Sequence, residues 1–248
     1  MRTVHGLHPV RELLRAGGEP PAELWISQGP ERARLGEIAR LARERGAKVR
    51  EAPRQKLDRL AGTDHHQGVV AVVADYRYRD LDELLAAARD RGEPPLLVLL
   101  DGIEDPQNLG AIVRSAHALG AHGVVVPRDR AAGVTAAAAR ASAGAVEHCP
   151  VARVTNLAQV LEELKERGLW SVAADPASDV PMGDLDLSGP IALVIGGEGR
   201  GLRPLVRRRC DHAGRIPMAG GVGSLNAAAA AAICLYEAAR QRAARRGS

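Results

Sequence analysis

The chain has 248 residues, of which 46% are hydrophobic and 26% are charged, and these proportions argue for a globular protein and against long-range disorder. It contains two tryptophans, three tyrosines and no phenylalanine, which argues against a surface that binds bases by rows of stacked rings. No apolar run is long enough for a membrane span, and the first residues lack the apolar region of a signal peptide. The three cysteines are scattered, which indicates reduced thiols in a cytoplasmic protein with neither disulfides nor a zinc site: Cys149, Cys210 and Cys234.

The net charge of +4 is unevenly distributed along the chain. Residues 1–80 hold 15 basic and 11 acidic residues, whereas residues 81–248 hold 19 of each. Only three of the 34 basic residues are lysines, and arginine has the planar fork that suits phosphate groups. A GC-rich genome explains the arginine preference equally well, so charge alone only hints at nucleic acid.

The first part of the chain alternates between helical and extended patterns, as in α/β proteins. The predicted elements are helices at 10–16, 31–45 and 54–61 and strands at 24–27, 48–52 and 69–74. A charged segment, 75–95, ends in Glu93-Pro94-Pro95 and is the best candidate for a domain boundary, although 81–88 inside it has a helical pattern.

The second part begins with the apolar run 96–100, which is typical of a strand covered on both faces. Further strands are predicted at 124–126, 151–154, 170–173, 191–195 and 214–216, with helices between them and a long Ala-rich helix at 225–245. The pattern predicts a parallel sheet of about 150 residues preceded by a smaller α/β domain.

Three glycine-rich turns follow predicted strands of the second part, at 101–110, 195–202 and 216–226. Ligands of open α/β sheets bind outside the carboxyl ends of the strands, where these turns fall. Two familiar nucleotide motifs fail. The third glycine of GxGxxG is replaced by Leu202 or Asn226, and no lysine closes a glycine run as in a P-loop. A dehydrogenase or an NTPase is therefore disfavoured.

The polar residues of these turns suggest a grip on a sugar-phosphate: one cation, one carboxylate, one hydroxyl and two amides, namely Arg114, Glu198, Ser224, Asn108 and Asn226. Each also has a purely structural explanation. Asn108 and Ser224 can be helix N-caps, Arg114 and Glu198 can form an ion pair, and Asn226 can be a turn residue.

Taken together, the turns resemble a known family. The stretches DPQNLGAIVRSAHALG, IGGEGRGLR and IPMAGGVGSLNAAAAAAICLYE look like the three motifs, in order and at family spacing, of the TrmH-type (SpoU) branch of the SPOUT superfamily. These are S-adenosylmethionine-dependent RNA ribose 2′-O-methyltransferases. VHGLHPVRELL and HHQGVVA resemble their substrate-binding domain, and GAVEHCPVARVTNLA fits the 23S ribosomal RNA guanosine-2′-O-methyltransferases. One departure is Asn226-Ala227-Ala228-Ala229, where relatives usually have Asn-Val-Ser-Val; the Ser and Asn positions stay intact.

The resemblance implies an α/β protein with a small RNA substrate-binding domain at 1–76, a linker at 77–94, and a parallel-sheet SPOUT domain at 95–248 with a C-terminal trefoil knot. It also implies a homodimer. S-adenosylmethionine would be contacted by Gly196, Ile216 and Leu225, with Gly197 and Met218 beside them, and no metal is required. The implied catalytic residues are Arg114, Asn108, Glu198, Ser224 and Asn226.

We expect a cytoplasmic enzyme that methylates the ribose of a guanosine in 23S ribosomal RNA and has no membrane partner. Arg114 would stabilise the developing alkoxide rather than act as a literal base, because a free guanidinium is always protonated. The alternatives are a transfer-RNA ribose methyltransferase and a ribosome-binding factor that has lost catalysis.

Overall fold

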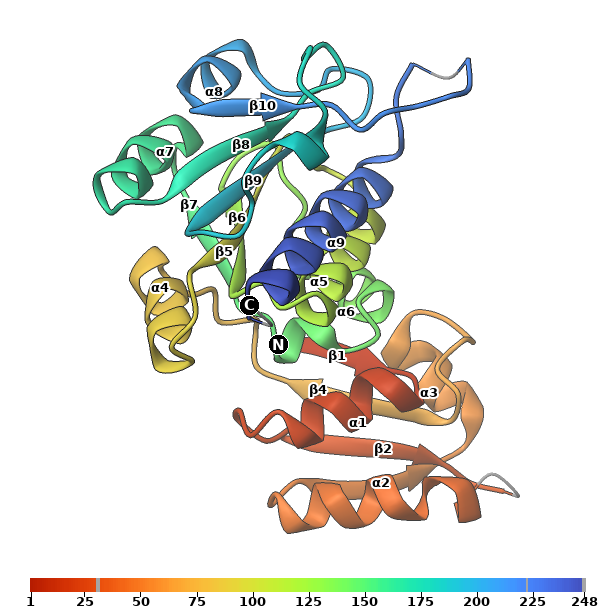
Figure 1. Cartoon of the computed structure of the whole chain (residues 1–248). Helices are drawn as coiled ribbons and strands as arrows, with labels where there is room; N and C mark the ends of the chain where they lie inside the picture. The colour runs from red at the N-terminus through yellow and green to blue at the C-terminus, as the bar shows by residue number, and fades with distance from the viewer. Residues whose placement is uncertain (30–31, 222, 247–248) are drawn as a thin grey trace.

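The computed structural model describes residues 1–29, 32–221 and 223–246 and contains two sheets, one above the other in Figure 1. The N-terminal sheet has the strand order β1-β4-β2-β3, and β4 is antiparallel to both of its neighbours while β2 and β3 are parallel. Its strands and helices are β1 Arg2–His5, α1 Leu7–Arg15, β2 Glu23–Ser27, α2 Arg32–Glu44, β3 Lys48–Ala52, α3 Arg54–Ala61 and β4 Val69–Val73.

Helices α1 and α2 pack on one face of this sheet and α3 packs on the other, so each face has its own hydrophobic core. Strand β1 was not predicted, because four residues of mixed polarity carry no apolar pattern. It is held by its pairing with β4, where Val4 lies opposite Ala71. Helix α1 begins three residues before the predicted start because Pro9 lies in the first turn, where its missing N–H is not needed. The predicted start of the next helix, Glu31, lies outside the described residues.

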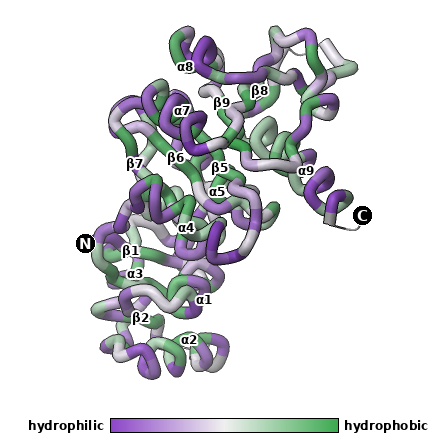
Figure 2. The backbone as a smooth tube through the Cα atoms, turned by 60° about the vertical axis from the view of Figure 1, so that its left-hand side comes forward, coloured by the Kyte–Doolittle hydropathy of each residue, from purple (hydrophilic) through white to green (hydrophobic). Residues whose placement is uncertain are grey.

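The C-terminal sheet has six strands in the order β10-β8-β9-β5-β6-β7, and all neighbours are parallel, as predicted. The central strands β5 and β9 are almost fully buried, and Figure 2 shows this part of the chain as hydrophobic. The strands are β5 Leu96–Asp101, β6 Gly123–Pro127, β7 Val151–Val154, β8 Trp170–Ala174, β9 Ile191–Gly196 and β10 His212–Gly214.

Helices cover both faces of the parallel sheet. One core holds side chains of α5 Pro106–Ala118, α6 Ala136–Ala141 and α9 Ala227–Arg246. The other holds side chains of α4 Leu81–Asp90, α7 Leu157–Glu166 and α8 Pro204–Arg209. Two short 3₁₀ turns, η1 Ala145–Glu147 and η2 Met182–Asp184, complete the three layers. In the described residues, no helix is long and apolar enough to cross a membrane.

The prediction of a strand at 214–216 is wrong, because β10 ends at Gly214. The polar residue Asp211 sets its register: its Oδ2 accepts hydrogen bonds from Ser171 N (3.0 Å) and Ser171 Oγ (2.7 Å), which align the chain with β8. Beyond Gly214 the chain leaves the sheet, and Arg215 bonds instead to the loop that contains Val180. Arg215 and Ile216 of the predicted strand therefore belong to a loop.

The segment 77–94 carries the helix that the pattern allowed, now α4, and its Leu84 is fully buried against the C-terminal sheet. Just before it, the Tyr76 hydroxyl accepts a hydrogen bond from Val151 N at 3.0 Å. A fragment containing the C-terminal sheet alone should therefore begin before Tyr76, because a later start removes part of the core.

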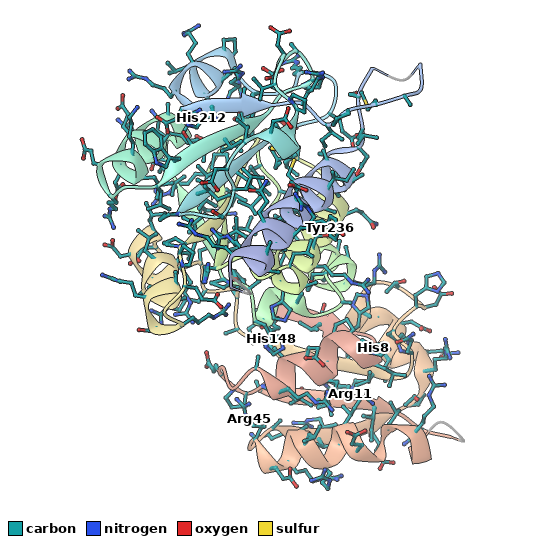
Figure 3. All side chains as sticks on the ribbon, viewed as in Figure 1. His8, Arg11, Arg45, His148, His212 and Tyr236 are labelled. Atoms are coloured by element: carbon teal, nitrogen blue, oxygen red, sulfur yellow. The ribbon has the colours of Figure 1, made fainter. Side chains whose placement is uncertain are left out.

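An ion pair and a hydrogen bond connect the N-terminal part to the part that contains the C-terminal sheet. Arg2 Nη2 lies 2.7 Å from Glu147 Oε1, and His148 Nε2, whose residue Figure 3 labels between the two parts, lies 3.0 Å from Glu12 Oε2. The Arg2–Glu147 pair is largely shielded from solvent, so it contributes more to docking than an exposed pair would.

Candidate functional site

The turns after β5 and β9 lie together at the carboxyl edge of the parallel sheet. Asp101 ends β5 opposite Gly196 of β9, and its carboxylate is fully buried. That carboxylate accepts hydrogen bonds from Arg203 Nε at 2.6 Å and Arg203 N at 2.7 Å, while Gly197 N donates to Asp101 O at 2.8 Å. These hydrogen bonds therefore connect the first glycine-rich turn to the second.

Three of the predicted catalytic side chains meet near this connection. Asn108 Nδ2 donates to Glu198 Oε1 at 3.1 Å, and Asn226 Nδ2 donates both to Asn108 Oδ1 at 3.0 Å and to Glu198 Oε1. Each residue comes from a different turn, so one network, the amide–carboxylate network of Asn108, Glu198 and Asn226, connects all three motifs. Charge-assisted bonds of this kind are stronger than neutral ones, which favours a single arrangement of the turns.

The structural explanations of these residues can now be judged. Helix α5 is capped by Asp105, whose Oδ1 accepts from Gln107 N at 2.9 Å, so Asn108 is not a cap. Helix α9 is capped by Asn226, whose Oδ1 accepts from the backbone N–H groups of residues 228 and 229. Ser224 is therefore not the cap of α9 either. Asn226 does two things at once, because its oxygen caps the helix while its amide nitrogen joins the network.

Arg114 is not brought to this network within one chain. It lies six residues beyond Asn108 on α5, about 9 Å along the helix axis and on another face. Its side chain is exposed and, in the described part of the chain, has neither a hydrogen bond nor an ion pair. The expected alternative of an ion pair with Glu198 is therefore wrong, since Glu198 is engaged by two amides instead.

A pocket of about 370 Å³ opens beside the network, and its lining includes every residue predicted to contact the cofactor: Gly196, Gly197, Ile216, Met218 and Leu225. Glu198 and Ser224 also line this pocket. Gly196 and Gly197 allow the turns to pack tightly, because a Cβ on Gly196 would lie 2.4 Å from the backbone carbon of Gly201. An apolar slot walled by backbone groups fits a nucleoside with a thin aromatic base.

The loop after β8 also lines this pocket, and the sequence analysis missed it. Partial burial disfavours ionisation of Asp175 in this loop, but hydrogen bonds from Arg207 Nε (2.5 Å) and Ala177 N (2.9 Å) outweigh it and lower the pKa of Asp175. The sequence did carry a signal for this loop, because the loop follows a correctly predicted strand, and ligands of parallel sheets bind at the carboxyl ends of the strands.

A second hollow of about 490 Å³ shares a wall with this pocket. Both are lined by the turn 197–201, and the second hollow adds Asn108, Arg130 and Arg203 from neighbouring elements. A methyl donor in one hollow and an acceptor in the other would meet at Glu198. Among the described residues, no group of three or more His, Cys, Asp or Glu side chains is placed to hold a metal ion.

Replacing Gly197 with alanine should weaken S-adenosylmethionine binding at least about tenfold. The new Cβ would lie 2.2 Å from the carbonyl oxygen of Gly102, so the second turn must move away from the first. Gly220→Ala is the matched control, because its Cβ meets nothing within 4 Å. Titration calorimetry should give the control a parental affinity, and equal affinities for both variants would contradict the assignment of this wall.

Comparison with known proteins identifies the family of the chain. Residues 95–236 match the SpoU rRNA Methylase family, and residues 3–79 match the RNA 2′-O ribose methyltransferase substrate binding family. YacO of Bacillus subtilis (strain 168), whose name places it in the TrmH family of tRNA/rRNA methyltransferases, is 48% identical over 220 residues, which are 89% of this chain and 88% of that protein.

Two solved structures resemble the whole chain. The SpoU methyltransferase AviRb from Streptomyces viridochromogenes, in complex with the cofactor AdoMet, aligns with a TM-score of 0.82 and 34% identity over 98% of this chain and 90% of that one. An AdoMet-bound rRNA methyltransferase from Sinorhizobium meliloti aligns with a TM-score of 0.78 and 28% identity over 96% of this chain and 87% of that one. Both solved structures contain AdoMet, that is, S-adenosylmethionine, which is the methyl donor of this family. The chain belongs to the TrmH/SpoU family of tRNA/rRNA methyltransferases.

Proposed function

We propose that this methyltransferase modifies the ribose 2′-hydroxyl of a guanosine in 23S ribosomal RNA, in the cytoplasm and as a homodimer. The observation that carries the reaction is the shared wall at Glu198 between the S-adenosylmethionine pocket and the second hollow. Support for ribosomal RNA comes from the N-terminal part, because the S. meliloti rRNA methyltransferase resembles the chain across both parts. The choice of guanosine rests on the resemblance of the stretch 144–158.

The bound cofactor supplies a methyl group on a positively charged sulfur, and the protein has to align and activate the ribose hydroxyl. The amide–carboxylate network holds the turns in register, which positions the acceptor against the pocket. Arg130 and Arg200 line the second hollow and suit the phosphates that flank a ribose. Arg114 stabilises the alkoxide as the hydroxyl loses its proton, which passes to a phosphate oxygen of the RNA.

The homodimer is supported by an exposed apolar face near the site. Of the large hydrophobic side chains exposed in the described residues, several come from α9 and the loop before it, including Tyr236 (61% exposed) and Ile233 (42% exposed). Figure 3 labels Tyr236 on α9, and α9 packs against α5, which carries Arg114. A second copy covering this face would give Arg114 the partner that it lacks within one chain. The resemblance also implies a C-terminal trefoil knot that contains these turns, and we include the knot in the proposal.

Mixing two inactive variants should restore methyl transfer if Arg114 acts across the dimer. Arg114→Ala leaves the Glu198 network intact, and Glu198→Ala leaves Arg114 intact, so a mixed dimer holds one complete site. Up to about a quarter of the parental activity should return after co-expression, because half of the dimers are mixed and each has one of two sites. No recovery, with mixed dimers demonstrated by mass spectrometry, would place Arg114 in the site of its own chain.

Mapping ribose methylation in ribosomal and transfer RNA from cells lacking this protein tests the substrate. We expect one 23S guanosine to lose its methyl group and to regain it when purified protein and S-adenosylmethionine are added, also in the presence of EDTA. A lost methyl group in transfer RNA instead would establish the alternative substrate, and unchanged methylation in both RNAs would overturn the proposal.

A further inference from the structure

A second basic site lies at the edge of the parallel sheet, away from the cofactor pocket. Four arginines surround Tyr78 in a hollow of about 620 Å³, and we call it the arginine hollow: Arg77, Arg79, Arg128 and Arg153. None of these residues belongs to the three glycine-rich turns or to the site described above, and only Arg153 lies in the stretch 144–158 that resembles the family.

Three segments build the hollow. The stretch around Tyr78 runs beside the edge strand β7, where Arg79 N donates to Val151 O at 3.0 Å. Arg128 follows the end of β6, and Arg153 lies near the end of β7. The Tyr78 hydroxyl oxygen accepts from Val134 N (2.8 Å) and from Arg153 Nη2 (2.9 Å), which fixes the ring at the centre. The phenolic proton remains available to an acceptor in the hollow.

The acidic residues of the hollow do not neutralise it. Glu83 is occupied by Arg79 at 2.8 Å, by Arg77 Nη2 at 3.6 Å and by the backbone N–H of Asp80 at 3.0 Å, and this last bond is the main reason why the pKa of Glu83 is lowered. One carboxylate therefore serves two of the four arginines. Asp80 caps α4.

Arg128 and Arg153 have no carboxylate partner within the described residues. The guanidinium of Arg153 lies 4.0 Å from the centroid of the Tyr78 ring, and its Nε is buried without a hydrogen bond. Two cations without a carboxylate partner therefore line one hollow, and a bound anion would neutralise them.

We infer that the arginine hollow binds the phosphate backbone of the RNA strand that enters the active site. This inference rests on the proposed function, in that the substrate is RNA. The carboxyl ends of β6 and β7 lie at the same sheet edge as those of β5 and β9, three strand spacings or about 14 Å from β9 to β7. Arg130, two residues beyond Arg128, lines the hollow that contains Asn108, so a basic path connects the two places.

The position of the hollow also suits a strand that contacts both parts of the protein. Arg77 and Arg79 follow β4, the last strand of the N-terminal sheet, by only a few residues. Guanidinium groups bind phosphate oxygens in pairs, and such contacts position a nucleic acid without reading its sequence. The arginine hollow would therefore set how the strand enters, while other contacts choose the nucleotide.

The test compares RNA binding by charge-removing variants at several salt concentrations, with an unmodified 23S transcript as the probe. R77Q/R128Q removes two exposed charges, and Arg153→Gln removes the half-buried one. The matched control is R89Q/R208Q, because both residues are exposed and have no carboxylate partner in the described residues. Arg89 lies about 13 Å along α4 from the capping residue Asp80, and therefore far from the arginine hollow.

We expect R77Q/R128Q to weaken RNA binding about tenfold and to lower the slope of log K against log salt by about 1 to 2, because fewer counterions are displaced. S-adenosylmethionine affinity and melting temperature should match the parent, and the control should keep the parental slope. An unchanged affinity and slope in both R77Q/R128Q and R153Q would overturn the inference. If the parent binds RNA but transfers no methyl group, the proposed function fails while the binding comparison still decides on the hollow.

Discussion

Replacing Asn226 with aspartate should lower the rate of methyl transfer about 100-fold while leaving the protein folded. Aspartate caps a helix as well as asparagine does, so the bonds to the first turn of α9 and the stability that they provide should persist. What is lost is the amide that donates to Asn108 and Glu198, and a second carboxylate then faces Glu198. Removing one preorganised donor from an active site costs about 10²–10³-fold in rate.

The pH dependence of this variant separates a role in the network from a role in folding. Two adjacent carboxylates raise the pKa of one of them, and its protonated form can again donate a hydrogen bond. The rate of Asn226→Asp relative to the parent should therefore rise as the pH falls, measured in single turnovers at saturating RNA. Asn226→Ala loses the helix cap as well, so its free energy of unfolding should be lower than the parental value by about 1 kcal/mol. A parental rate for Asn226→Asp would show that the network only supports the fold.

The parallel sheet was predictable because its central strands β5, β6 and β9 are short apolar runs, as expected of strands covered on both faces, and helical patterns alternate with them. The carboxyl-edge rule then placed the three glycine-rich turns at one site, and the five residues expected at the cofactor do line one pocket. Those inferences need only the order of elements and the direction of strands. Both follow from local sequence.

Contacts between distant residues were not predictable in this way. Asn226 and Asn108 are 118 positions apart, and no spacing rule pairs two particular side chains across such a distance. The cap at Asp105 was a missed local signal, because aspartate followed by proline is a common helix start. Tyr78 was a second missed signal, because an aromatic residue in a charged segment indicates that the segment packs on the protein. In the structure, Arg153 contacts both the ring and the hydroxyl of Tyr78.

Arg114 is the residue for which sequence and structure disagree most usefully. The resemblance gives it the central role, but within one chain it is exposed, lies outside both hollows and has no partner in the described residues. An arginine that only stabilises the fold would have a local carboxylate or carbonyl, as Arg203 has with Asp101. Its exposure therefore favours a role toward RNA or a second copy of the chain.

Arg114→Ala should lower the single-turnover rate of methyl transfer by about 10²–10⁴-fold, because both charge stabilisation and positioned proton transfer are lost. Arg114→Lys should fail nearly as badly, since a point charge cannot reproduce the guanidinium fork. S-adenosylmethionine affinity should barely change in either variant, because Gly196, Ile216 and Leu225 line a pocket that excludes Arg114. Melting temperatures should also stay near the parental value, as an exposed side chain without a partner contributes little to stability. Gln107→Ala, an exposed change on the same helix, is the matched control and should keep its rate. If Arg114→Lys transfers methyl groups at a near-parental rate, a positive charge alone is sufficient and the role of Arg114 at the alkoxide is wrong.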